Sequence, residues 1–175
     1  RGRPRQPQGH PRGGFGGAPK FPVAPPLRFL QRTGRADVAG RALAAMAASE
    51  LRDADGGFFR YATQRDWTVP HYERMLTDNA QLIDVALVAG ADDVVRGIAS
   101  FLLTVLRRDS GAFGSAQDSE SWIDGERSEG GYYRRTPEAR AELMAPAVDG
   151  KVLTGWNGLA IGALARAGAV MHEPE

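Results

Sequence analysis

The stretch HYERMLTDNAQLIDVALVA, residues 71–89, decides the fold that we predict for this chain. On a wheel with about 100° per residue, its apolar side chains fill one broad arc. Pro70 suits the first turn of a helix, where the missing N–H costs nothing, and Gly90 suits its end. The sequence therefore predicts a helix that opens after Thr68 and runs to about Ala89.

Further elements are predicted on both sides of this helix from apolar spacing and turn residues. Helices are expected from about Arg35, after Asp92, from Thr136-Pro137-Glu138 and over Thr154–Met171. Short paired strands are expected at 112–116 and 131–135. These elements predict a mainly α, all-α class fold of antiparallel helical hairpins with one small β-hairpin.

Composition limits the classes of protein that the chain can represent. It has 175 residues, 42% hydrophobic and 25% charged, which suits one globular domain. It has no cysteine, which excludes disulfides, thiol catalysis and Cys-ligated zinc within these residues. No apolar run reaches the ~18 residues that cross a bilayer, and no signal peptide opens the sequence. We therefore expect no membrane contact and, by default, a cytoplasmic location.

Charge and composition predict a boundary near residue 26. Residues 1–26 form a basic linker, rich in proline and glycine, that we expect to lack regular structure, whereas 27–175 form the domain. Residues 1–12 contain four arginines and no acid, and the remainder holds 18 basic and 21 acidic residues. A mildly acidic domain argues against nucleic-acid binding, because phosphate contacts need clustered cations.

His71, Asp78 and Asn79 fall inside the apolar arc of the wheel. Two explanations stay open: these side chains satisfy one another in a helix core, or the arc faces a solvent-filled cavity. In the second case His71 is the candidate catalytic acid or base and Asp78 its orienting partner.

Aromatic and charged residues just ahead of the helix favour the cavity. Sugar sites combine aromatic faces with carboxylates and arginines, and this segment supplies the candidate binding residues Arg60, Tyr61, Asp66 and Trp67. The alternative is a surface turn in which Trp67 packs against the helix.

Two later segments add candidates. Asp118 and Glu120 are paired carboxylates that suit acid/base work on a glycosidic bond, although two loop acids are more often simply solvated. Lys151, Trp156 and Asn157 could line the same cavity, or could cap and pack the last helix. No set of side chains has metal-ligand spacing, so we predict neither a metal nor a cofactor.

Six segments together resemble one family, in the same order along residues 13–168. They are 14–22 (GFGGAPKFP), 56–61 (GGFFRY), 67–82 (WTVPHYERMLTDNAQL), 118–120 (DSE), 129–133 (EGGYY) and 151–159 (KVLTGWNGL). They are similar to the thioredoxin-domain-containing family related to a spermatogenesis-associated thioredoxin-like protein. That family has a thioredoxin-like N-terminal domain and a C-terminal (α/α)6 toroid like those of six-hairpin glycosidases and N-acylglucosamine 2-epimerases.

The resemblance implies a partial α/α toroid whose central cavity is lined by aromatic and acidic residues. The chain departs from the family pattern at Phe59, where a histidine is usual, at Thr77, where a tyrosine is usual, and in the acidic loop, which lacks one aspartate. About five helices cannot close a ring of twelve. The resemblance therefore implies a fragment, or a chain that needs the rest of the toroid or another chain as a partner.

The functional prediction is a carbohydrate-active or sugar-binding domain with a small saccharide as ligand. Under this interpretation Asn79 lines the pocket together with the residues named above. The alternative is a non-catalytic structural or interaction module, a degenerate or truncated remnant of such a protein. The sequence leaves open whether the chain is an enzyme.

Overall fold

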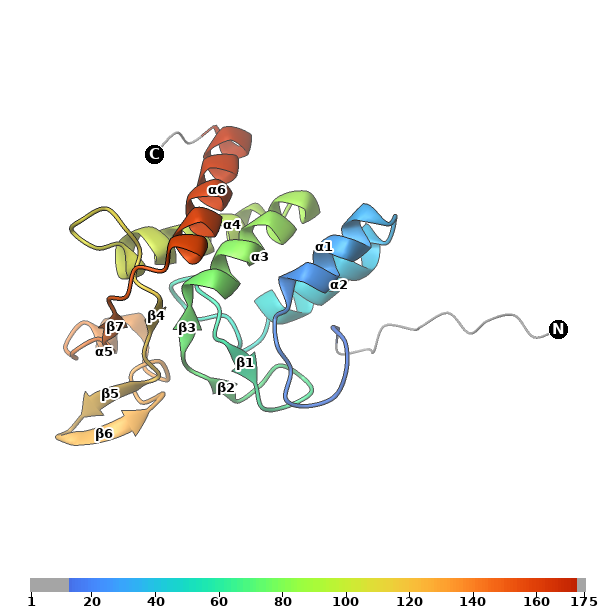
Figure 1. Cartoon of the computed structure of the whole chain (residues 1–175). Coiled ribbons are helices and arrows are strands. Elements are labelled where there is room, and N and C mark those ends of the chain that lie inside the picture. Colours follow the sequence, from blue (N-terminus) through green and yellow to red (C-terminus); the bar gives the residue numbers. More distant parts are fainter. Residues whose placement is uncertain (1–12, 173–175) are drawn as a thin grey trace.

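A computed structural model of the chain describes residues 13–172 (Figure 1). The basic tail, residues 1–12, lies outside this part, so the predictions made for it are not addressed. None of the helices in the described part is long and apolar enough to cross a membrane.

Six α-helices and one π-helical turn lie within residues 13–172, and α3 lies at their centre. It packs against α1, α2, α4 and α6 (Figure 1). The bounds are α1 Ala24–Arg32, α2 Ala36–Ala47, α3 Leu76–Ala89, α4 Asp92–Phe101, η1 Leu102–Leu106, α5 Pro137–Arg140 and α6 Thr154–Met171. The core is built mainly from the faces that these helices turn toward α3, including Leu43, Leu82, Ile98 and Ala160, each at most 1% exposed.

Seven short strands gather at the end of the helices where α3 and α6 begin (Figure 1). They are β1 Tyr61–Ala62, β2 Pro70–His71, β3 Arg74–Met75, β4 Ala116–Gln117, β5 Glu120–Ile123, β6 Glu126–Glu129 and β7 Val148–Asp149. They pair antiparallel as β1-β2, β3-β4-β7 and β5-β6.

These strands correct the predicted fold class: the chain is mixed α and β, and the expectation of a mainly α partial toroid is wrong. The predicted helix does not open after Thr68. Pro70–His71 pairs with β1 and Arg74–Met75 pairs with β4, so α3 begins only at Leu76. Pairing with distant strands overrides the helical pattern of 71–75, because the strand bonds satisfy the same backbone groups.

The predicted strand pair 112–116 with 131–135 is also wrong. The four-residue hairpin joins β5 to β6 through Asp124-Gly125, both at positive φ (53° and 85°). Two central residues with positive φ give the turn whose twist suits a tight hairpin. Residues 131–135 form turns instead.

Most of the other predicted helices are confirmed. α6 has the predicted bounds, α4 begins at Asp92, and the hydroxyl of Thr136 accepts a hydrogen bond from the N–H of Ala139 at the start of α5. α1 was missed. It begins inside the segment expected to lack regular structure. Its two prolines, Pro25 and Pro26, occupy the first turn, where the N–H group that proline lacks would have no partner within the helix.

The two longest helices carry an asparagine that makes the same three bonds in each. Asn79 Oδ1 accepts from the N–H of Phe58 at 2.7 Å, and its Nδ2 donates to the carbonyls of Phe58 and Met75, both at 3.0 Å. Asn157 does the same to Phe113, at 2.8 and 3.0 Å, and to Leu153, at 3.2 Å. Each asparagine fixes the start of its helix on a phenylalanine backbone far back in the chain.

The segments that hold these phenylalanines also match. We call residues 51–59 the first hairpin and residues 106–114 the second hairpin. Asp53, Gly56 and Phe59 donate to Gly57, Asp53 and Leu51, and the residues 55 positions later repeat all three backbone bonds. The chain therefore contains two copies of one unit, in which a hairpin follows a helix and is clamped by the asparagine of a later helix.

A buried ion-pair network stabilises the strand layer beneath the first hairpin. Asp53 accepts two hydrogen bonds from Arg140, both at 2.7 Å, and one from Arg74 at 3.2 Å. Arg74 also contacts Asp55 and donates to Gln117. The side chains of Arg74 and Asp53 are 1% and 3% exposed, so each charge depends on its partner.

Candidate functional site

The candidate site is centred on His71, in the second position of β2. Its side chain is 28% exposed, and Nδ1 lies 2.9 Å from Oε1 of Glu129, the last residue of β6. Nε2 lies 3.8 Å from Oε2 of Glu73, two residues further along the chain. A hydrogen bond at one ring nitrogen fixes the orientation of the ring, and the other nitrogen faces a second carboxylate.

The ring of His71 also has an aromatic neighbour. Tyr61, directly opposite in β1, stacks on it with 5.0 Å between ring centroids and 22° between planes. Phe21 lies 4.9 Å beyond Tyr61. The strand register brings these rings together, because residues directly opposite in an antiparallel pair share one face.

A second charged pair adjoins His71. Arg60 Nη1 lies 2.7 Å from Oε2 of Glu73, the carboxylate oxygen that faces the histidine. Burial raises the pKa of Asp78, in the first turn of α3, to about 6, against the opposing effect of Arg60 and with a contribution from Glu73. We call this set the His71 cluster: Arg60, Tyr61, His71, Glu73, Asp78 and Glu129.

The geometry differs from the predicted arrangement of His71 and Asp78. The two do not lie two turns apart on one helix, since His71 is in a strand and only Asp78 is in α3. The residue that holds the His71 ring is Glu129, which the sequence reasoning did not single out. It lies in the motif Glu129–Tyr133, quoted above for the family resemblance, and that motif was the signal available for finding it.

The acidic loop approaches the same place from β5. Glu120 lies directly opposite Glu129 in the β5-β6 pair, and it forms an ion pair with Arg127. The Oδ1 atom of Asp118 accepts from the N–H of Glu120 at 3.1 Å, which stabilises the turn into β5. Glu120 is therefore a neighbour of the cluster, whereas the backbone of Asp118 bonds the hydroxyl of Tyr133 and the carbonyl of Ala147.

Three predicted binding residues lie in the core instead. Trp67 is 3% exposed beneath the ammonium group of Lys20, 4.3 Å from its ring centroid. Asn79 and Asn157 are 0% and 7% exposed, and their amides are occupied by the backbone bonds described above. The contacts of the two asparagines match the alternative in which buried polar side chains are satisfied by the core.

The remaining predicted residues have separate surroundings. Asp66 accepts from the hydroxyl of Thr68 at 2.6 Å. Lys151 is exposed and pairs with Asp149 at 3.1 Å, and Trp156 packs half-buried against the core in the first turn of α6. In the three-stranded sheet, β4 lies between β3 and β7, and the chain continues from β7 into α6. Lys151 and Trp156 follow β7 and are therefore not brought into the His71 cluster.

The opposite face of β2 borders a cavity of about 580 Å3. Pro70 and Tyr72 line it together with Phe59, Arg134 and Arg135. Neighbouring strand residues point to opposite faces, so His71 and this cavity use different sides of the strand. Within residues 13–172 no group of three or more His, Asp or Glu side chains is arranged to hold a metal ion.

The chain is similar in sequence to known proteins. It is 39% identical over 159 residues to human spermatogenesis-associated protein 20 and 37% identical over 159 residues to the mouse protein, and each match covers 79% of this chain. The chain is a relative of spermatogenesis-associated protein 20. An uncharacterised Caenorhabditis elegans protein is 32% identical over 130 residues, or 62% of this chain.

The matched region is a small part of each relative. This relative of spermatogenesis-associated protein 20 spans 20% of the length of the human and mouse proteins and 18% of the nematode protein. No family model matches the chain. The identities to the human and mouse proteins support the relation to spermatogenesis-associated protein 20 that the six motifs predicted.

Proposed function

We propose that the His71 cluster binds a small saccharide and can exchange protons with its hydroxyl groups. The observation that carries the proposal is the convergence of three chain segments on His71. β1 supplies a stacking aromatic ring, β6 supplies the carboxylate that holds the imidazole, and residues 73–78, which include the first turn of α3, supply two further acids. Aromatic faces with carboxylates and an arginine are the groups that sugar sites use.

The chemistry assigned to the cluster follows from two groups. When Nδ1–H of His71 donates to Glu129, the Nε2 atom carries the lone pair and can accept a proton. Asp78, with its pKa raised to about 6, holds a proton for part of the time near neutral pH. An acid whose pKa lies near the working pH, placed close to a proton acceptor, is an arrangement that general acid–base catalysis favours.

The choice of a saccharide over other hydroxylated molecules rests on the sequence resemblance. The motifs resemble a family whose C-terminal part is similar to six-hairpin glycosidases and N-acylglucosamine 2-epimerases. We propose that the thioredoxin-like domain of that family, and any redox role it has, lies outside this chain. The resemblance of the motifs, and not the fold, supports the ligand class, and the reaction is to be measured.

Thermal unfolding in the presence of sugars tests the proposal. The chain is melted with glucose, mannose, N-acetylglucosamine, N-acetylmannosamine and maltose in turn. We expect one of these to raise Tm by about 2–4 °C, which corresponds to about 1 kcal/mol of linkage for a domain of this size. His71→Gln should unfold at the same temperature without sugar and should lose the response.

A matched control is available in the second copy of the unit. Asp149 pairs with Ala116 in the register in which His71 pairs with Tyr61, so it occupies the equivalent strand position. Asp149→Asn should keep the full sugar response. A response to no sugar, or one that survives His71→Gln, would contradict the proposal and favour the alternative of a non-catalytic interaction module.

A further inference from the structure

The inference starts from what covers the first hairpin. Arg52 Nη1 donates to Oδ2 of Asp93 at 2.9 Å, and its Nη2 donates to the Asp93 carbonyl at 2.8 Å, at the start of α4. One helical turn later Gly97 contacts Gly56, so closely that a Cβ atom on either glycine would collide with the other. α4 is therefore seated on the first hairpin by an acid and a glycine four residues apart.

The second hairpin offers the same two features, and no helix of residues 13–172 lies on them. Arg107 stands where Arg52 stands in the first copy; it is exposed, and the structure gives it no ion pair within residues 13–172. Gly111 stands where Gly56 stands; it is exposed, and a Cβ atom there would meet nothing within 4 Å. Gly56, in contrast, is buried.

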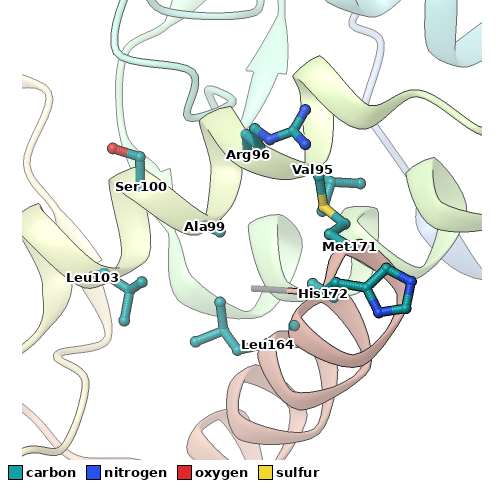
Figure 2. Close-up of a pocket in the computed structure, with 10 residues that line it drawn as sticks. Val95, Arg96, Ala99, Ser100, Leu103, Leu164, Met171 and His172 are labelled. Carbon is teal, nitrogen blue, oxygen red and sulfur yellow. The ribbon is translucent and has the colours of Figure 1, made fainter. Parts of the chain in front are cut away.

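An apolar groove accompanies this exposed hairpin. It lies between α4 and α6 and has a volume of about 520 Å3 (Figure 2). Figure 2 shows the side chains of Val95 from α4, Leu103 from η1, and Leu164 and Met171 from α6 bordering the same space.

The matching position on α3 in the first copy is covered. Ala86 corresponds to Leu164, because each lies seven residues after the clamping asparagine, and Ala86 is 0% exposed whereas Leu164 is half-buried. The first copy thus shows what a filled version of this surface looks like. In it, α4 packs against α3 and completes the core.

We propose that the second hairpin and the α4–α6 groove bind an amphipathic α-helix of the same design as α4. The helix carries an acidic residue that pairs with Arg107 and, four residues later, a glycine that lies against Gly111. Its apolar face packs in the groove against α6 at Leu164, as α4 packs against α3 in the first copy. The positive charge of Arg107 requires an acidic residue on the helix. The open space at Gly111 allows the backbone of the helix to approach the hairpin closely.

The chain itself supplies the probe for this site. A peptide with the sequence of residues 90–103 contains the acid and the glycine in the required spacing, Asp93 and Gly97. A hydrocarbon link between positions 96 and 100, both exposed and one turn apart, keeps it helical. Binding of the labelled peptide to the whole chain is followed by fluorescence polarisation, without any saccharide, so the outcome is independent of the His71 proposal.

Charge reversal decides the result. We expect saturable binding, a Kd at least tenfold higher for Arg107→Glu, and recovery to within threefold when that variant meets a peptide with Asp93→Arg. Arg108→Glu is the matched control, because this neighbouring exposed arginine corresponds to Asp53, and it should leave Kd within twofold. No binding of the unmodified peptide, equal binding by Arg107→Glu, or equal loss in Arg108→Glu would each overturn the proposal.

Discussion

The first and second hairpins have the same backbone hydrogen bonds and different surroundings. In the first, Phe58 and Asn79 are both fully buried, and α4 and the Asp53 ion pairs enclose the turn. In the second, Phe113 and Asn157 keep 5% and 7% exposure, and Arg107, Arg108 and Gly111 face solvent. Local sequence is thus sufficient to form the hairpin and its asparagine clamp, whereas neighbouring elements set how much each bond contributes to stability.

The largest difference in the free energy of unfolding is expected at one pair of positions that correspond in the two hairpins. Asp53→Ala leaves Arg74 and Arg140 without their buried carboxylate and should lower the free energy of unfolding by about 4 kcal/mol. Arg108→Ala, 55 positions later and exposed, should change it by less than about 0.5 kcal/mol. Urea denaturation measures both, and similar losses in the two variants would contradict the account.

The second largest loss of stability is expected when the asparagine clamp of the first copy is removed. Asn79→Ala removes three hydrogen bonds and leaves the N–H and carbonyl of Phe58 buried without partners. We expect a loss of about 3 kcal/mol, because buried groups without partners bear their full desolvation cost. A loss below about 1 kcal/mol in the same urea experiment would show that the clamp is not what fixes α3 on the first hairpin.

The clamp of the second copy should be weaker. Asn157→Ala breaks the same three bonds, but water reaches Phe113 more easily and can replace part of them. The expected loss is about 1–2 kcal/mol. Differential scanning calorimetry of both variants compares the copies directly, and a larger loss for Asn157→Ala than for Asn79→Ala would reverse the assigned order.

The smallest expected effect on stability comes from the residue that precedes each clamping asparagine. Asp78 precedes Asn79, and Trp156 precedes Asn157, so only the first copy titrates at this position. The folded pKa of Asp78, about 6, exceeds the ordinary value of 3.8, so the native state holds the proton more tightly than the unfolded chain. The stability that this proton provides is therefore lost as the pH rises from about 4 to about 6.

Asp78→Asn removes that titration. We expect the variant to be more stable than the natural chain by about 1 kcal/mol at pH 7, less than the full pKa shift corresponds to because solvent partly reaches Asp78, and equal to it at pH 3.5. Urea midpoints across the pH range measure the difference. A constant gap between the two curves would show that Asp78 does not carry the shift.

The long periodic helices were within reach of sequence reasoning. α4 and α6 have regular apolar spacing and clear starts, and burial of that face decides their formation. The strand layer was not predictable in the same way, because Pro70–His71 and Arg74–Met75 become strands only through partners at Tyr61–Ala62 and Ala116–Gln117. Such pairing depends on segments far apart in sequence, which no local pattern records.

The candidate site shows the same division. His71, Arg60 and Tyr61 were singled out from residue type and order, and the structure brings them together. Glu129 was missed because it reaches His71 from a hairpin 58 residues away. Asn79 and Asn157 were assigned to a pocket because a wheel and a motif cannot distinguish a polar side chain that lines a cavity from one that bonds buried backbone.

Hydrogen–deuterium exchange at matched amides tests the central claim most directly. The amides of Asp53, Gly56 and Phe59 in the first hairpin make the same bonds as those of Arg108, Gly111 and Gly114 in the second. If neighbours rather than local bonds set the stability of each copy, the first three should exchange at least tenfold more slowly. Equal exchange in the two sets, or slower exchange in the second, would contradict it.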